Sequence, residues 1–142
     1  MKGFGSLKNN NPVKKKIPKK DNKKILLLNS AVNFHVNGNI EAAEKLYKYI
    51  IKNNFANESI YSNYAVIFLS KGDYKNAESY ARKAIDLNPN FIDAYSNLSN
   101  ILKCLGNLNE AEFFARKALK LNTEHVDANL NLGVILFEQN KL

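Results

Sequence analysis

The chain has 142 residues, a formal net charge of +8 and a single cysteine, Cys104. This length suits one domain, no apolar run approaches the roughly 18 residues that span a membrane, and the apolar stretch at 25–28 is too short for the core of a signal peptide. A single cysteine excludes an internal disulfide, so packing must stabilise the fold and a reducing, cytoplasmic location is the expected default.

A basic tail opens the chain and carries all of its excess charge. Residues 1–24 hold nine lysines against one aspartate, whereas residues 25–142 hold 12 basic and 12 acidic side chains. Two of the three prolines lie in this tail and its apolar periodicity is weak, so residues 1–24 are expected to be disordered. The segment KKKIPKK is suited to bind nucleic acid or an anionic membrane, to serve as a nuclear address, or to act only as a solubilising leader. The lysines concerned are Lys14, Lys15, Lys16, Lys19 and Lys20.

From residue 24 onward the sequence repeats itself every 34 residues without insertions. Three full copies occupy about 24–57, 58–91 and 92–125, and a half copy occupies 126–142. The recurring positions include Gly38, Gly72 and Gly106, then Ala43, Ala77 and Ala111, and finally Asn29, Asn63, Asn97 and Asn131. A repeat of this length indicates an array of stacked units.

Each copy is expected to fold as two amphipathic helices. In the third copy the first helix, at about 93–105, carries apolar residues at helical spacing, and Gly106 is placed to end it. A second helix follows at about 109–121, with Asn107 or Asn109 as its cap. One such pair cannot bury its apolar face alone, so the copies must stack.

Small residues predict where the paired helices approach each other closely. They are Ala65, Ser99 and Gly133 on first helices, and Ala77 and Ala111 on second helices. The larger Tyr61, Tyr95, Phe68 and Leu102 are expected to fill the space between the helices. Added bulk at the small positions is expected to cause strain.

Taken together, these positions resemble the tetratricopeptide repeat. The resemblance is carried by Tyr61, Tyr95, Asn97-Leu98-Ser99, Gly106, Ala111, Ala118 and Pro89, and it covers about 24–142. It implies an all-α solenoid in which antiparallel helix pairs form a right-handed superhelix, with the first helices lining a concave groove. In this family the groove usually binds peptides or other proteins. The pattern DAYSNL…LK..G…EA is particularly similar to repeats beside O-linked N-acetylglucosamine transferase catalytic domains and their bacterial relatives.

In those transferases an asparagine ladder holds the backbone of an extended substrate peptide, so the resemblance implies the same role for Asn29, Asn63, Asn97 and Asn131. Helical geometry places Ser59, Asp93, Asn100 and Asp127 on the same face as these asparagines. An amide offers two donors and an acceptor, which suits both groups of a peptide backbone. The alternative is that duplication copied an asparagine that has no ligand.

Catalysis within these residues is not expected. His35 and His125 have no cysteine or carboxylate at metal-ligand spacing, and Cys104 has no histidine pattern or nucleophile motif beside it. The sequence also lacks a glycine-rich phosphate loop and a paired-carboxylate motif. We therefore expect no catalytic residue, no metal and no cofactor.

Several functions fit this pattern. The first hypothesis is a scaffold that binds an extended peptide or a partner protein in the groove. The second is a substrate-recruiting module of a larger glycosyltransferase, sulfotransferase or hydroxylase whose catalytic domain lies outside this chain. The third is an array anchored to nucleic acid or an anionic membrane by its lysine tail. The last helix, LNLGVILF, also leaves Leu132, Ile135 and Leu136 partly without partners, so self-association through this edge is a further expectation.

Overall fold

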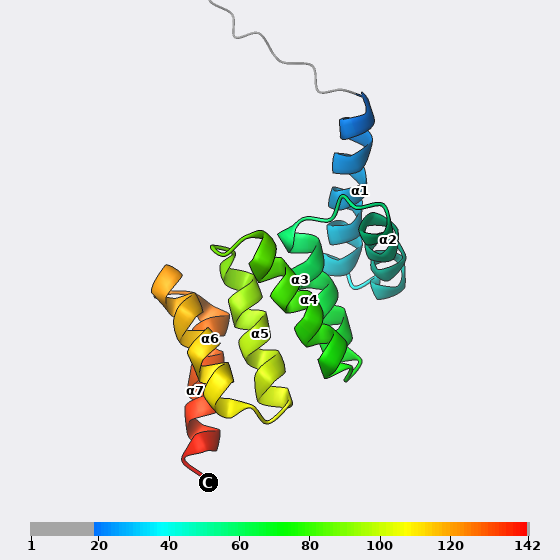
Figure 1. Cartoon of the computed structure of the whole chain (residues 1–142). Helices are drawn as coiled ribbons and strands as arrows, with labels where there is room; N and C mark the ends of the chain where they lie inside the picture. Colours follow the sequence, from blue (N-terminus) through cyan, green and yellow to red (C-terminus); the bar gives the residue numbers. More distant parts are fainter. Residues whose placement is uncertain (1–18, 142) are drawn as a thin grey trace, which may run out of the picture.

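The computed structural model describes residues 19–141, which form seven helices and no strand (Figure 1). They are α1 (Lys19–Val36), α2 (Ile40–Lys52), α3 (Glu58–Ser70), α4 (Tyr74–Leu87), α5 (Ile92–Cys104), α6 (Leu108–Leu121) and α7 (Val126–Gln139). The all-α class and the helix-pair repeat predicted from the 34-residue period are therefore confirmed. Not one of these seven helices combines the length and apolarity needed to cross a bilayer.

The first helix begins earlier than the sequence suggested. Residues 19–24, expected to belong to a disordered tail, form the first turns of α1. No proline follows residue 18 in this part of the chain, and Asp21 lies in the first turn, where a carboxylate interacts favourably with the helix dipole. Lys19 and Lys20 are thus helical, whereas Lys14, Lys15 and Lys16 lie outside the described residues.

Glycine ends the first helix of each full repeat. Gly38, Gly72 and Gly106 have φ angles of +78°, +75° and +81°, in the left-handed region where a side chain is disfavoured. The turn at Gly106 is closed by two bonds, from its own N–H to the Lys103 carbonyl at 2.9 Å and from the Asn107 N–H to the Leu102 carbonyl at 2.9 Å. The predicted stop signal is confirmed.

Replacing Gly72 by alanine is expected to lower the free energy of unfolding by about 1 to 2 kcal/mol, because an L residue is strained at positive φ. A Cβ at this position would meet no atom within 4 Å, so the loss would come from the backbone alone. Gly133 is the matched control, since it lies inside α7 with equally open space, and alanine there is expected to stabilise the helix by about 0.5 to 1 kcal/mol. Urea unfolding followed by circular dichroism measures both, and equal effects would contradict the assignment.

The small residues do mark the contact between paired helices. Ala65 and Ala77 are fully buried, and the buried Ser99 hydroxyl donates a hydrogen bond to the Ala111 carbonyl at 2.8 Å across the α5–α6 pair. Gly133 is different because it is exposed, with no described second helix packed against that side of α7. The prediction that small residues mark the close approach of paired helices therefore holds for the complete helix pairs.

The last helix exposes different residues from those expected. Ile135 is fully buried in a cluster with residues of α5 and α6, and Leu132 packs against that cluster. The exposed apolar side chains are Val126, Leu130 and Phe137, because α7 turns Ile135 toward α5 and α6 and leaves its opposite side open. The apolar residues that this edge exposes are thus not the predicted Leu132, Ile135 and Leu136, and self-association through it stays a prediction.

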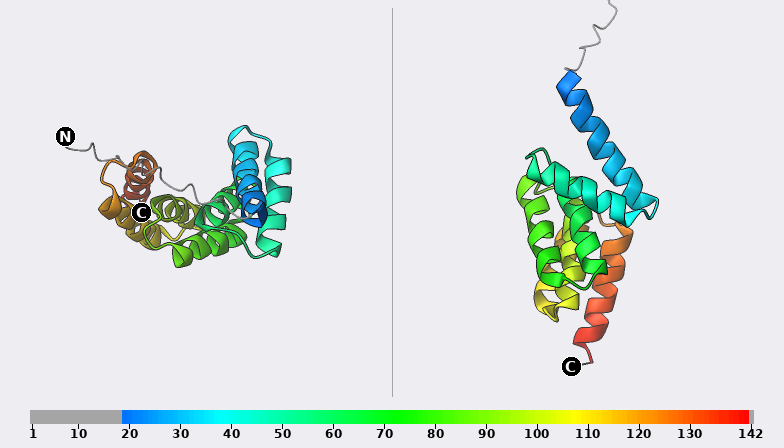
Figure 2. Two further views of the ribbon diagram at one scale, coloured as in Figure 1. Left: turned by 90° about the horizontal axis from the view of Figure 1, so that it is seen from above. Right: turned by 90° about the vertical axis from the view of Figure 1, so that its right-hand side faces the viewer.

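The helices are arranged as an arc. Seen end on, α1 and α7 lie at its two tips (Figure 2). The backbones of the first helices α1, α3, α5 and α7 lie close to one another in succession. Those of α2, α4 and α6 stand farther apart, and α4 meets α6 only through side chains such as the Arg82–Glu110 ion pair at 2.6 Å. Helices that touch lie on the inner side of a curved stack and helices that splay apart lie on the outer side. The first helices therefore line the concave face, as the resemblance implied.

Candidate functional site: a polar groove along the first helices

The recurring asparagines lie on this concave face, one on each first helix. Asn63 on α3, Asn97 on α5 and Asn131 on α7 are half-buried, whereas Asn29 on α1 is exposed. Asparagine is a poor helix former, so its place in all four first helices needs a compensating interaction. The structure supplies one for three of them.

Two of the asparagines join successive repeats through hydrogen bonds. The Asn97 amide donates to the Ser62 hydroxyl at 2.9 Å, and the Asn131 amide donates to the Ser96 carbonyl at 3.0 Å and to its hydroxyl at 3.3 Å. Both serines are buried and lie 35 residues earlier, on the preceding first helix. The asparagine therefore has a structural role, which is to bond the preceding repeat. The repeat pattern did not reveal this role, although Ser62 and Ser96 directly precede Asn63 and Asn97 in the sequence.

The third asparagine has another partner, because the residue 35 positions before Asn63 is Leu28. Asn63 instead hydrogen-bonds Tyr47 on α2. Burial raises the pKa of Tyr47 to about 12, and the Asn63 amide opposes this shift. The Tyr47 hydroxyl also lies 3.1 Å from Nδ1 of His35, whose pKa is lowered by burial. His35 is thus a packed structural residue.

These inter-repeat bonds leave part of each amide free. Asn97 and Asn131 use only the amide nitrogen toward the array, and their carbonyl oxygens accept no hydrogen bond from residues 19–141. The nitrogen carries two hydrogens, so a second N–H also remains on Asn97. The Asn97 amide can therefore bond a backbone N–H and a backbone C=O of a ligand while it holds the neighbouring repeat, whereas Asn131 offers its carbonyl oxygen to a backbone N–H.

A hollow of about 240 Å³ crosses three of the helices at this face. It is lined by Asn63 and Val66 of α3, by Asp93, Ser96 and Asn97 of α5, and by His125 and Asp127 at the start of α7. Four of the eight predicted groove residues thus come together: Asn63, Asp93, Asn97 and Asp127. Asn29, Ser59, Asn100 and Asn131 lie outside this hollow, on the first helices.

His125 is a part of this site that the sequence analysis overlooked. Its Nδ1 accepts a hydrogen bond from the Ala128 N–H at 3.2 Å and so caps α7. Nε2 must then carry the proton, which it donates to Oδ1 of Asp93 at 3.0 Å. The carboxylate lies 32 residues away in sequence, so only the stacking of repeats reveals the pair. Within residues 19–141 no three His, Cys, Asp or Glu side chains are placed to hold a metal ion.

Family models and solved structures agree with this architecture. Residues 58–91 and residues 80–113 each match a model of the tetratricopeptide repeat (TPR). No curated protein matches the sequence. The repeat units, the helix pairs and their curvature identify residues 19–141 as a TPR solenoid, as the resemblance implied.

Three solved structures show the likeness. The second TPR domain of human RPAP3, in complex with the HSP70 peptide SGPTIEEVD, has 26% identity and a TM-score of 0.71, over 81% of this chain and 96% of that one. The first TPR of Spaghetti (RPAP3), bound to the HSP90 peptide SRMEEVD, has 22% identity and a TM-score of 0.76, over 84% and 94%. A mutant O-GlcNAc transferase of Thermobaculum terrenum has 22% identity and a TM-score of 0.78, over 84% of this chain but 23% of that one.

Proposed function

We propose that the array is a scaffold that binds an extended peptide of a partner protein along α1, α3, α5 and α7. The observation that carries this proposal is the polar hollow that crosses three first helices and is lined by amides with unused hydrogen-bonding groups. Two structural neighbours hold HSP70 and HSP90 peptides, which shows that arrays of this size can capture short peptides. With its single cysteine, the protein suits a reducing cytoplasm.

The spacing of the amides fits an extended ligand. Packed helices lie about 8 to 10 Å apart, and an extended chain advances by about 3.3 Å per residue. One amide would therefore meet about every third residue of the peptide. Bonds to the peptide backbone do not depend on its side chains, so the ladder supplies affinity and leaves selection to other residues of the groove.

Substitution of Asn97 separates its two roles. Asn97→Ala removes both the bond to Ser62 and the proposed bonds to the peptide, and it is expected to weaken peptide binding about 3- to 10-fold, since a net hydrogen bond is worth about 0.5 to 1.5 kcal/mol. Asn63→Ala added to Asn97→Ala should weaken binding further. Titration calorimetry with a peptide selected from a displayed random library measures the change.

The matched control is Ser62→Ala, which removes only the inter-repeat bond and keeps the amide of Asn97. Both variants should lose a similar amount of stability in urea unfolding, yet only Asn97→Ala should lose peptide affinity. Equal affinities of the two variants would show that this asparagine serves the array alone.

A second candidate is a substrate-recruiting module of a larger enzyme. The catalytic domain of that enzyme, of glycosyltransferase, sulfotransferase or hydroxylase type, would lie outside this chain. This candidate is favoured by the likeness to the Thermobaculum terrenum O-GlcNAc transferase, where the matched part is 23% of the enzyme. The repeats would then present a substrate to a domain outside this chain. Sequencing the transcript past the codon of Leu142 tests it: an open frame into a catalytic domain supports this candidate, and a stop codon there overturns it.

A further inference from the structure

The concave stripe has a charge opposite to that of the whole chain. The stripe consists of the four asparagines with the residues four before, three after and seven after each of them. These positions hold Asp93, Asp127 and Glu138 but no lysine or arginine, in a chain with 21 basic and 13 acidic residues. The stripe is therefore acidic, although residues 25–142 as a whole are neutral.

The two aspartates of the hollow are available to a ligand. Asp127 forms no ion pair within residues 19–141, and Asp93 uses only Oδ1, toward His125. Both lie in the first turn of their helices, where the dipole stabilises the ionised carboxylate. No cation of the array lines the hollow to neutralise them.

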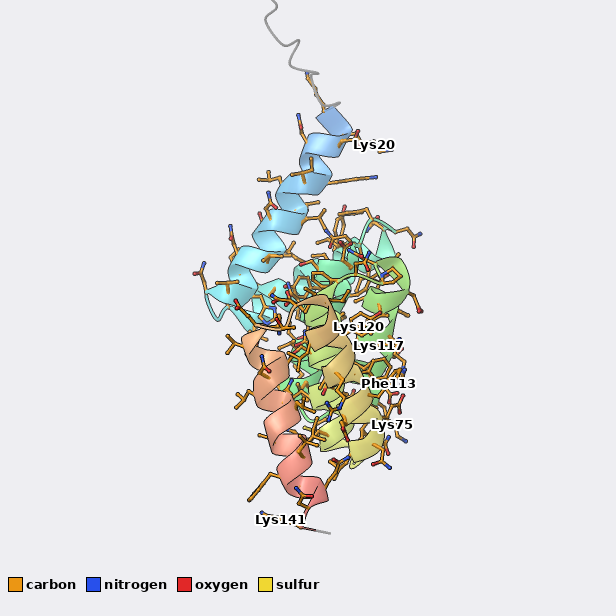
Figure 3. The ribbon with its side chains drawn as sticks, turned by 90° about the vertical axis from the view of Figure 1, so that its left-hand side faces the viewer. Lys20, Lys75, Phe113, Lys117, Lys120 and Lys141 are labelled. Carbon is orange, nitrogen blue, oxygen red and sulfur yellow. The ribbon has the colours of Figure 1, made fainter. Side chains whose placement is uncertain are left out.

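Two lysines of the second helices lie over aromatic rings outside the hollow. Nζ of Lys117 lies 4.9 Å from the centroid of the Phe113 ring on α6, and Nζ of Lys83 lies 5.1 Å from that of Tyr80 on α4. Phe113, Lys117 and Lys120 follow one another along α6 (Figure 3). Cation–π contacts of this kind keep the ammonium groups over the rings rather than over the groove.

We propose that the groove selects peptides that carry lysine or arginine and disfavours acidic ones. This inference rests on the proposed peptide-binding function and names the class of peptide. A long cationic side chain places its aliphatic stem against Val66 and its charged end between Asp93 and Asp127, while Asn63 and Asn97 hold the adjacent backbone. The peptides that this groove prefers would then have a charge opposite to that of the acidic ends of SGPTIEEVD and SRMEEVD, the peptides held by two structural neighbours.

The test uses the full chain and three fluorescein-labelled 12-residue peptides of one extended scaffold. They differ only in carrying Lys and Arg, Ser and Gln, or Asp and Glu at alternate positions, and SRMEEVD is added as a fourth probe. Fluorescence anisotropy at low and at physiological salt is expected to rank the basic peptide above the neutral one and the neutral above both acidic probes. The preference should weaken with salt because the aspartates lie at the surface.

Asp127→Asn should weaken binding of the basic peptide by up to about fivefold, as expected for one partly exposed pair, and leave the neutral peptide unaffected. Adding Asp93→Asn should bring the basic and neutral peptides to equal affinity. The matched control is Asp86→Asn on α4, which removes the same charge from an exposed site off the stripe and should change nothing.

The outcomes separate the two proposals. Acidic probes that bind as tightly as the basic one, or an equal effect of Asp86→Asn and Asp127→Asn, overturn the charge selectivity and leave peptide binding intact. Failure of all four peptides to bind overturns the peptide-binding function and the selectivity that rests on it.

Discussion

Leu98→Ala is expected to lower the free energy of unfolding by about 2 to 5 kcal/mol, since it deletes a fully buried side chain and leaves a cavity. Leu98 lies on α5, in a cluster with Ile101 and Ile135, and α5 contacts both helices of the preceding pair, its own partner and α7. A domain of this size is stable by only about 5 to 15 kcal/mol in total. Urea unfolding monitored by circular dichroism should therefore show a large shift of the midpoint.

Leu130→Ala on α7 is the matched control, because the Leu130 side chain is 64% exposed and the same atoms are removed from the surface. We expect a change within about 0.5 kcal/mol. A loss as large as that of Leu98→Ala would mean that this face of α7 is covered in solution. Dependence of the midpoint on protein concentration would then identify a second copy as the cover.

Alkaline unfolding is the second large effect, and it arises from two buried tyrosines. Burial raises the pKa of Tyr47 and of Tyr64 to about 12, with the charge of Glu44 and the neighbouring Tyr80 adding to the shift at Tyr64. Their pKa values in the unfolded chain are near 10, so the folded state holds more protons above that pH. Stability is therefore fully present below pH 10 and falls as the pH rises to about 12. The loss is about 2 to 3 kcal/mol for each tyrosine.

Urea midpoints at pH 9 and pH 11 capture about half of this loss, since pH 11 lies midway between the two pKa values, and Tyr64→Phe removes one of the two ionisations. The variant should lose less stability than the parent between the two pH values. Tyr49→Phe is the control, because the Tyr49 side chain is 48% exposed and the same hydroxyl is removed from the surface. A pH response that is the same in all three proteins would contradict the assignment to buried tyrosines.

The repeating part of the fold was predictable because the residues that end helices and pack between them recur at the same positions in every copy. Gly72 and Gly106 showed where helices end, and Ala65 and Ser99 showed where paired helices touch. The ends of the array were less predictable. A repeat has only one neighbour there, so the helical start at Lys19 does not follow from the period. The burial of Ile135 does follow from it, since Ile135 occupies the same position as the buried Ile67 and Ile101.

Only half of the site could be predicted in the same way. Helical periodicity placed Asn97 and Asp93 on one face, but it says nothing about how far one first helix is shifted along the next. That shift decides that Asn97 reaches Ser62 and that His125 reaches Asp93. Both pairs join residues more than 30 positions apart, and neither forms a motif that can be recognised within one repeat.

The wider spacing of α2, α4 and α6 than of the first helices has a mechanical consequence. Bending the arc changes distances mainly on its outer side, where α4 and α6 are joined by side chains such as the Arg82–Glu110 ion pair. The inner helix contacts and the Asn97–Ser62 bond would change least. The array is thus an elastic spring, softest toward changes in curvature. A bound peptide that bridges two amides would fix the distance between successive turns of this spring, and would stiffen the whole array without touching its outer helices.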